Sequence, residues 1–204
     1  MDVLNNLAMR LNFAIRRHPS RWLYTDRMLG SYVDPHEAPY LTRTWANGPI
    51  WDVGASVGKY TAMLATSNPA TKIFAFEPNL NSLYYLGYRT ARFANVVIVP
   101  NALTADGGFL KGSYDPDFNG QATGPVVATI SLRDATEKFG RPGFVKMDIE
   151  GGEYSVFESD EAQLLMNSTI LVSWHPKITG KAIPTVKGWK NTRLSTDISL
   201  LEPM

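Results

Sequence analysis

The sequence predicts an α/β fold: a Rossmann-like domain with a doubly wound, mostly parallel sheet and helices on both faces. From residue 50 onward, short apolar runs alternate with segments of helical periodicity. The runs are predominantly apolar, which is typical of strands that are covered on both sides. A glycine-containing turn follows the first run, as in nucleotide-binding folds of this kind.

Each predicted element has a local signal. The predicted strands are residues 50–53, 72–77, 95–103, 143–150 and 169–176. The predicted helices are 59–68, 79–94 with an asparagine cap, a short helix within 128–140, and 152–167 with a break near Ser159. Residues 104–128 are rich in Gly, Asp, Pro and Asn and favour a hairpin-like insertion. The tail from residue 177 is expected to add a final pair of strands or an edge.

The length of 204 residues suits one globular domain, or one domain with an arm. We expect a helical arm and linker over residues 1–49 and the main domain over residues 50–204. Residues 3–17 have apolar residues near helical spacing, with arginines between them, and favour an amphipathic helix packed on the domain. Residues 30–49 contain several Gly and Pro and are expected to be mostly loop with a short helix.

Composition excludes several classes of function. The formal net charge is +1, so no global field draws the chain to nucleic acid or membrane. Cysteine is absent, which excludes disulfides, zinc–thiolate sites and cysteine nucleophiles. No apolar run is long enough to span a bilayer, and the start lacks a signal-peptide pattern, so a cytoplasmic location is expected. No pattern indicates an oligomeric state.

The turn "DVGASVG" indicates a ligand that carries a positively charged group near Asp52. Gly54 and Gly58 bracket the turn from strand to helix, where glycine lets backbone approach a ligand closely. Ser56 stands where a dinucleotide site would place its middle glycine, the one that admits a pyrophosphate. Asp52, at the strand end, is unfavourable beside a pyrophosphate and favourable beside an amine or sulfonium.

The ends of the next two predicted strands complete an adenosine-type site. Glu77 ends the second strand, at a position from which an acid hydrogen-bonds ribose hydroxyls. Asn101 lies near the end of the third predicted strand and either meets an adenine edge or is a turn residue. S-adenosylmethionine fits this combination. The predicted cofactor-binding residues are Asp52, Gly54, Ala55, Ser56, Gly58, Tyr60, Thr61, Glu77, Pro78, Asn79, Asn101, Ala102 and Asp148.

The segment "FVKMDIEGGEYSVF" is the most specific in the chain. Lys146, Asp148 and Glu150 alternate along an otherwise apolar strand, and Glu153 follows after two glycines. Buried strands rarely carry three charged residues, so these side chains leave the core at the rim or pair with one another. A structural lysine–acid network, with Glu153 as a helix-start carboxylate, is the alternative to a functional site.

The segments "IWDVGASVGKYT", "FAFEPNLNSLYYL", "VPNAL", "FVKMDIEGGEYSVF" and "ILVSWHP" resemble FkbM-type S-adenosylmethionine-dependent methyltransferases. They cover residues 50–176 in the order of that family. The resemblance implies a seven-stranded, class I methyltransferase fold. It also implies O-methylation of a hydroxyl, with a sugar or another small natural-product moiety as the acceptor.

Methyl transfer to an alcohol requires alignment and a base or cation near the hydroxyl. His175, at the end of the fifth predicted strand, is the expected base or hydrogen-bond partner of the acceptor, because imidazole titrates near neutral pH. Asp148 and Glu150 are further candidates, either directly or through Mg²⁺, although their spacing is not specific for a hard cation and no metal site is assigned. Lys146 would stabilise an alkoxide or neutralise its acidic neighbours.

Three alternatives stay open. An RNA ribose 2′-O-methyltransferase would use the arginines of the chain along a strand of RNA, and the low net charge weighs against it. A NAD-type oxidoreductase is disfavoured by Asp52 and Ser56. A non-catalytic subunit that binds adenosylmethionine is the third. The acceptor pocket is expected to involve the arm and residues 104–128. The aromatic residues Phe109, Tyr114 and Phe118 either stack on a sugar or base there or form a minor core.

Overall fold

The computed structural model describes residues 33–111 and 126–204, with side chains omitted from the description at 109–111. The chain divides into two units, Met1–Pro35 and His36–Met204, and every described helix and strand lies in the second. The predicted helix at 3–17 and the aromatic residues Tyr114 and Phe118 lie outside the described residues, as does the side chain of Phe109. The predicted boundary between arm and domain at residue 49 stays a prediction.

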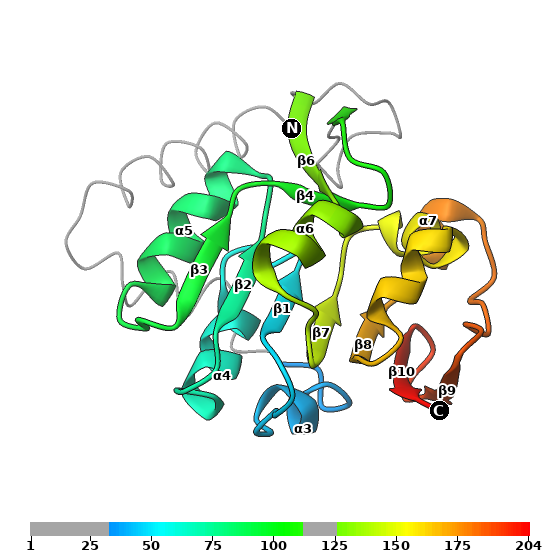
Figure 1. The fold of residues 1–204 in the computed structure, drawn as a ribbon, viewed down its shortest axis with the longest axis horizontal. Coiled ribbons are helices and arrows are strands. Elements are labelled where there is room, and N and C mark those ends of the chain that lie inside the picture. Colours follow the sequence, from blue (N-terminus) through cyan, green and yellow to red (C-terminus); the bar gives the residue numbers. More distant parts are fainter. Residues whose placement is uncertain (1–32, 112–125) are drawn as a thin grey trace, which may run out of the picture. The chain divides into compact units, whose positions relative to one another are not determined.

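A seven-stranded sheet forms the centre of this unit, in the order β3-β2-β1-β7-β8-β10-β9 (Figure 1). The pairs β1–β2, β2–β3, β1–β7 and β7–β8 are parallel, whereas β10 runs antiparallel to β8 and β9. The predicted α/β class with a mostly parallel sheet is therefore confirmed. The strands are β1 Ile50–Val53, β2 Ile73–Phe76, β3 Val96–Val99, β7 Phe144–Met147, β8 Thr169–Ser173, β9 Trp189–Arg193 and β10 Ile198–Pro203.

Helices α4, α5 and α7 with η1 connect parallel strands of the central sheet, as the sequence predicts (Figure 1). Asn79 caps α5 by accepting from the backbone of Asn81 and Ser82, and Ser131 caps α6 by accepting from Asp134. Ser159 separates α7 from a 3₁₀ helix, so the predicted break is confirmed. The helices are α3 Ala38–Leu41, α4 Lys59–Ser67, α5 Leu80–Thr90, α6 Leu132–Phe139, α7 Gly152–Glu158, η1 Asp160–Leu165 and α8 Pro176–Thr179.

The region after β3 differs from the prediction. The predicted strand 95–103 is interrupted at residues 100 and 101, where the amide of Asn101 donates to the carbonyl of Val99. The chain then enters a separate three-stranded sheet of β4 Ala102–Thr104, β6 Val126–Ser131 and β5 Phe109–Lys111. The β5–β6 pair is antiparallel and β4–β6 is parallel, so the insertion is a hairpin joined to a returning strand.

Alternation along the strands separates an apolar face from a charged one. Trp51 and Val53 of β1 enter the large core cluster beneath α6 and α7. Asp52 and its register partner Lys146 on β7 point to the opposite face, where Thr61 of α4 meets Asp52. Both charged residues are buried. The sheet therefore places a carboxylate and an ammonium side by side, close to the carboxyl ends of its central strands.

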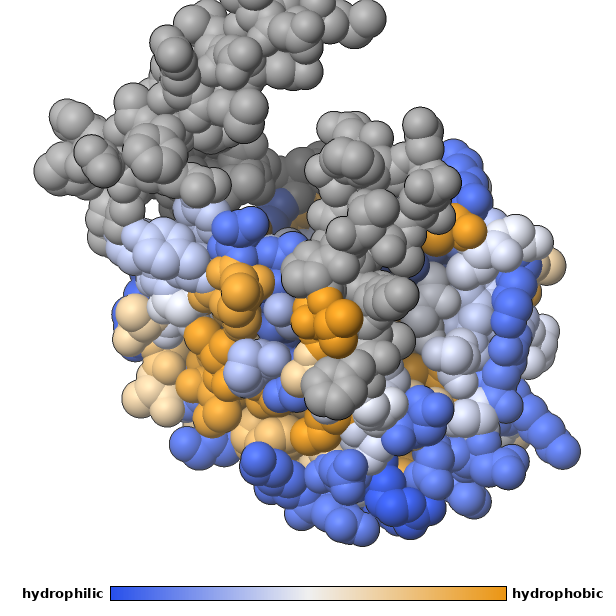
Figure 2. Space-filling view, turned by 90° about the horizontal axis from the view of Figure 1, so that it is seen from above, coloured by the Kyte–Doolittle hydropathy of each residue, from blue (hydrophilic) through white to orange (hydrophobic). Residues whose placement is uncertain are grey.

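The surface of the described residues is mixed in polarity. Seen from above in Figure 2, hydrophobic residues gather in the middle of the described surface and hydrophilic residues border them. Large apolar side chains that stay exposed include Leu80, Val126 and Ile178. Among the residues described, no helix combines the length and the apolar character needed to cross a bilayer.

Candidate functional site at the carboxyl ends of the central strands

The glycine turn after β1 is shaped by contacts within the chain. Gly54 and Gly58 have φ angles of +84° and +80°, and Ser56 between them is also left-handed at +48°. A Cβ on Gly54 would lie 1.8 Å from the carbonyl oxygen of Asp148, and one on Gly58 would lie 2.7 Å from Leu86 Cδ1. The sequence prediction explained these glycines by the approach of a ligand. In the structure they also let the turn approach the end of β7 and helix α5.

Glu77 ties the glycine turn to the start of α5. Its Oε2 accepts from the backbone amide of Ser56 at 2.8 Å, and its Oε1 accepts from Asn79 at 2.7 Å. The side chain is fully buried, and this burial raises the pKa of Glu77 while the two amide bonds act in the opposite direction. Each carboxylate oxygen keeps a second lone pair, so the arrangement is compatible with a ribose hydroxyl as a further partner.

Asp52 is a buried acid with a single hydroxyl partner. Thr61 Oγ1 donates to Asp52 Oδ2 at 2.5 Å, and the side chain is about 1% exposed. Burial raises the pKa of Asp52 to about 6, although the bond from Thr61 and the positive charge of Lys146 oppose this shift. The ionised form of a carboxylate held in this way is stabilised by any further cation nearby.

Lys146 is a buried ammonium with three partners. Its Nζ lies 2.8 Å from Ser173 Oγ, 3.0 Å from Glu37 Oε1 and 3.4 Å from Asp148 Oδ2. The ring of Tyr60 lies 5.5 Å from the same nitrogen. Lys146 is 0% exposed, and its contact with Asp148 links it to the group around His175. Charges on Glu37, Asp52 and Asp148 all act on this one ammonium, so carboxylates outnumber cations here.

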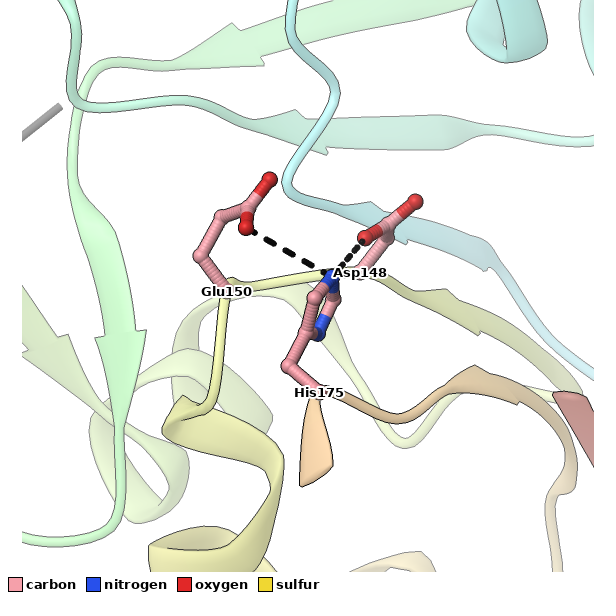
Figure 3. Close-up of side chains that lie close together, drawn as sticks. All are labelled: Asp148, Glu150 and His175. Atoms are coloured by element: carbon pink, nitrogen blue, oxygen red, sulfur yellow. Dashed lines mark ion pairs between the residues drawn. The ribbon is translucent and has the colours of Figure 1, made fainter. Parts of the chain in front are cut away.

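His175 lies beside three carboxylates just after β8. Its Nδ1 is 2.9 Å from Oε1 of the buried Glu153, and its Nε2 is 3.4 Å from Asp148 Oδ1 and 3.5 Å from Glu150 Oε2 (Figure 3). Glu153 is fixed in turn, because its carboxylate accepts from the backbone amides of Ile149 and Gly151. The imidazole therefore presents Nε2 to the side of the cluster that faces Asp148 and Glu150.

Protonation at this cluster follows from these contacts. The bond to Glu153 raises the pKa of His175 above its ordinary value, and Asp148 and Glu150 add to the effect while burial opposes it. Burial raises the pKa of Glu150, with His175 acting in the opposite direction. A carboxylate acceptor at Nδ1 requires that nitrogen to carry the proton, so in the neutral ring the lone pair sits on Nε2.

The same three side chains lie close enough together to converge on a cation. One ligand atom from each of Asp148, Glu150 and His175 lies within 4.8 Å of the others. Ligand atoms around one divalent ion lie at roughly 3.0–3.5 Å from one another when metal–ligand distances are about 2.1 Å. The two distances from His175 Nε2, 3.4 and 3.5 Å, meet this criterion. The cluster can therefore relay a proton as it stands, or hold a divalent ion, with positions left open, if the two carboxylates move together around it.

The structure gathers most of the predicted residues and leaves others apart. Asp148 is shared by the Lys146 group and the His175 group, so the predicted catalytic residues form one continuous cluster. Asn101 instead donates its side-chain amide to the carbonyl of Thr129, and Ala102 begins β4. The candidate set gains three residues that were not predicted as site residues, namely Glu37, Glu153 and Ser173.

The comparison with protein families gives a match that covers most of the chain. The family model of the methyltransferase FkbM domain matches residues 52–180. Among curated proteins, the chain is similar to hexuronic acid methyltransferase AglP of Haloferax volcanii, at 25% identity over 162 residues. That match covers 74% of this chain and 65% of the relative, so the chain spans slightly less than two thirds of the relative's length.

Solved structures show a likeness of fold. A putative O-methyltransferase from Klebsiella pneumoniae superposes with a TM-score of 0.50 at 10% identity, covering 85% of this chain and 82% of that one. A putative rRNA-methylase from Clostridium thermocellum gives 0.50 at 9% identity, covering 81% and 90%. At such identities the likeness supports the Rossmann-like methyltransferase architecture and nothing finer.

Proposed function

Because this chain belongs to the FkbM methyltransferase family, we propose that it transfers a methyl group from S-adenosylmethionine to a hydroxyl of a sugar or another small natural-product acceptor. The family and the fold imply this methyl donor. The named activity of the Haloferax relative supports a sugar derivative as the acceptor class. The observation that carries the proposal is that a carboxylate-rich group and an oriented imidazole share Asp148 at the carboxyl ends of the central strands.

The residues of the turn fit the donor in charge and in shape. Glu77 and the backbone of the glycine turn would hold the adenosine half, where a buried acid meets ribose hydroxyls. Asp52 would lie toward the methionine half, where its burial and raised pKa make a neighbouring sulfonium or ammonium favourable. Carboxylates exceed cations around Lys146, which also favours a positively charged ligand over a pyrophosphate.

His175 is the proton acceptor in this proposal. The bound donor supplies an electrophilic methyl group, so an oxygen–carbon bond forms as the sulfur–carbon bond breaks and S-adenosylhomocysteine remains. The acceptor hydroxyl lies against Nε2 of His175 and gives its proton to that nitrogen. Glu153 holds the ring in the tautomer that keeps Nε2 free, and Asp148 and Glu150 stabilise the imidazolium that forms. Mg²⁺ is not required by this scheme.

The test combines binding with transfer. Calorimetry should show binding of S-adenosylmethionine and S-adenosylhomocysteine to the wild type. Glu77→Ala should weaken both by about 1–3 kcal/mol, because a charged hydrogen-bond partner of the ribose is lost. The control is Glu158→Ala, which removes an exposed carboxylate paired with Lys181. Unchanged affinity in Glu77→Ala, or binding of NADH in place of the methyl donor, would contradict the proposal for the turn.

Transfer is assayed against a panel of sugars, uronic acids and short RNA with labelled donor. The wild type should methylate a small acceptor, and His175→Ala should keep donor affinity while transfer falls by about 10²–10⁴-fold, the usual worth of a general base. Full activity in His175→Ala would remove the residue from the role of base. Methylation of RNA alone, with an affinity that falls steeply with salt, would favour the ribose 2′-O-methyltransferase alternative. Binding of the methyl donor without transfer to any acceptor would favour a non-catalytic subunit. The expected cytoplasmic location stays a prediction.

A further inference from the structure

Glu37 lies outside residues 52–180, yet its carboxylate reaches the proposed active site. It occupies the N-cap position of the short helix α3, and its side chain is 3% exposed. Oε1 lies 3.0 Å from Lys146 Nζ and also accepts from Ser173 Oγ at 3.0 Å. No local sequence pattern marks this residue, because the partner residues are more than a hundred positions away along the chain.

The segment that carries Glu37 is anchored to the unit by packing. Leu41 at the end of α3 is fully buried, and the ring of Trp45 stacks on Phe144 at the start of β7, with a centroid distance of 4.0 Å. The backbone of Trp45 donates to the side chain of Asn68 after α4. These contacts fix the backbone near Glu37, so the carboxylate is held in place before any ligand binds.

The contacts of Glu37 continue to the reacting end of the site. Lys146 has three N–H donors, and its three close partners are Ser173, Glu37 and Asp148. The hydroxyl of Ser173 then donates its own proton to Glu37. The other oxygen of Asp148 lies 3.4 Å from His175 Nε2. A continuous series of polar contacts therefore runs from Glu37 through Lys146 and Asp148 to the imidazole.

The balance of charge explains why Glu37 is needed in this position. A buried ammonium without a close carboxylate is strongly unfavourable. Ser173 offers only a neutral hydroxyl, and Asp148 is one-third exposed and more distant from Lys146 than Glu37 is. Without Glu37, the carboxylates that still act on Lys146 are Asp148 and the buried Asp52. Asp52 is held by Thr61, so Asp148 is the one that would turn toward the ammonium and away from His175.

We propose that Glu37 is a positioning residue of the methyl-transfer site, which occupies Lys146 so that Asp148 stays against His175. The role in transfer rests on the function proposed above, whereas the effect on His175 does not depend on turnover. A site assembled in this way requires the segment that precedes the family-matched region. Glu37 itself touches neither the acceptor nor the methyl donor.

The test compares Glu37→Gln with Glu202→Gln, a carboxylate that pairs with Lys190 on the surface. We expect kcat of Glu37→Gln to fall by about ten- to a hundredfold, as for a small misplacement of a reacting group. The acceptor KM and the donor affinity should stay within about threefold of the wild type, and Glu202→Gln should behave as the wild type. Unchanged kcat in Glu37→Gln would overturn the proposal.

A second variant moves the carboxylate to the neighbouring strand. Glu37→Ala combined with Ser173→Glu places a carboxylate next to Lys146 from β8. If Glu37 acts by occupying the ammonium, kcat of the double variant should recover to within about fivefold of the wild type, while Glu37→Ala alone stays low. If the double variant melts like the wild type but shows no recovery, the carboxylate is not the active feature and the proposal fails.

A spectroscopic readout separates this proposal from the proposed function. The groups facing the imidazole are Glu153, Asp148 and Glu150. If Asp148 turns away in Glu37→Gln, the ring proton signals of His175 should titrate at lower pH than in the wild type. An unshifted titration would overturn the positioning role even in a protein that transfers no methyl group. A shifted titration with no transfer by the wild type would leave the positioning role in place and reject the proposed function.

Discussion

His175 Nδ1 lies 2.9 Å from Glu153 Oε1, and this contact decides which nitrogen of the ring can accept a proton. Glu153 is fully buried and is held by two backbone amides from the turn that follows β7. The carboxylate therefore cannot rotate away without leaving those amides unpaired. As a result, the tautomer of His175 is set by the turn "IEGGE", and the reactive Nε2 is left facing Asp148 and Glu150.

The first prediction concerns the pH dependence of transfer. A base must be neutral to accept a proton, so kcat/KM should fall as pH drops through the raised pKa of His175. Because the bond to Glu153 is the largest cause of that shift, Glu153→Gln should lower the pKa and move the acidic limb to lower pH. The maximal rate should fall by about tenfold, since a less basic ring is a weaker proton acceptor.

The pH profile is measured as kcat/KM with labelled donor between pH 5 and 9, on a logarithmic scale. Glu158→Gln is the matched control, because it removes an exposed carboxylate from the same helix. Its profile should superpose on that of the wild type. An acidic limb that stays in place in Glu153→Gln would show that another group titrates in the wild type.

The second prediction concerns the stability of the ligand-free protein. The pKa of Asp52 is raised to about 6 in the folded state, from 3.8 for an ordinary side chain, so the folded state binds its proton more tightly than the unfolded state does. The free energy of unfolding therefore decreases as pH rises from about 4 to 6, and the loss is complete above pH 6. Asp52→Asn keeps an oxygen for Thr61 and carries no charge, so it should be more stable than the wild type above pH 6.

The expected gain for Asp52→Asn at pH 8 is roughly 1–3 kcal/mol, and it should vanish near pH 4. Urea unfolding at several pH values measures it, with the exposed Asp197→Asn as the control. The same variant should bind S-adenosylmethionine more weakly. Its affinity for S-adenosylhomocysteine, whose sulfur is uncharged, should change less. If Asp52→Asn were less stable than the wild type at pH 8, burial would not be destabilising the ionised form of Asp52.

The sequence predicts the residues that lie in local motifs and misses those that depend on distant contacts. Asp52 and Glu77 could be found because each ends an apolar run beside a glycine turn or a helix cap. The break after Val99 could not be placed, since the choice between one strand and two depends on which sheet residues 102–104 join. The closing strands β9 and β10 were expected only as a pair or an edge. β10 pairs with β8 on one side and with β9 on the other, and the β9 sequence WKNTR is mostly polar, which gives no clear strand signal.

Within the site, the limit of sequence reasoning has the same cause. Glu153 belongs to a recognised motif, but a carboxylate at a helix start has an ordinary electrostatic explanation, and only the position of His175 shows its second contact. Glu37 has no motif and lies in a segment whose composition favours loop. Its role becomes visible only when Lys146 is seen to be fully buried and in need of a carboxylate.

The third prediction tests how closely the glycine turn packs. Gly54→Ala and Gly180→Ala both place a side chain at positive φ, which costs about 1–2 kcal/mol. Gly180 has open space around an added Cβ, whereas at Gly54 that atom would overlap the carbonyl of Asp148. Gly54→Ala should therefore lose about 1–3 kcal/mol more than Gly180→Ala and should also lose donor binding. Equal stability of the two variants in urea unfolding would show that the turn does not pack against Asp148.

The fourth prediction decides between a proton relay and a bound metal at Asp148, Glu150 and His175. In the relay, Nε2 must be free, so a divalent ion at the cluster would block the base. Mg²⁺ prefers an octahedral shell of oxygen ligands, and here one of the three ligand atoms is a nitrogen and Glu150 is half exposed. We therefore expect transfer to be unchanged after dialysis against EDTA. Added Mg²⁺ or Mn²⁺ should not accelerate transfer, and excess Mn²⁺ should inhibit it by binding the imidazole.

The opposite result would be a loss of activity in EDTA that either ion restores in the wild type but not in Asp148→Asn or Glu150→Gln. That result would assign the cluster to a metal and make His175 a ligand instead of a base.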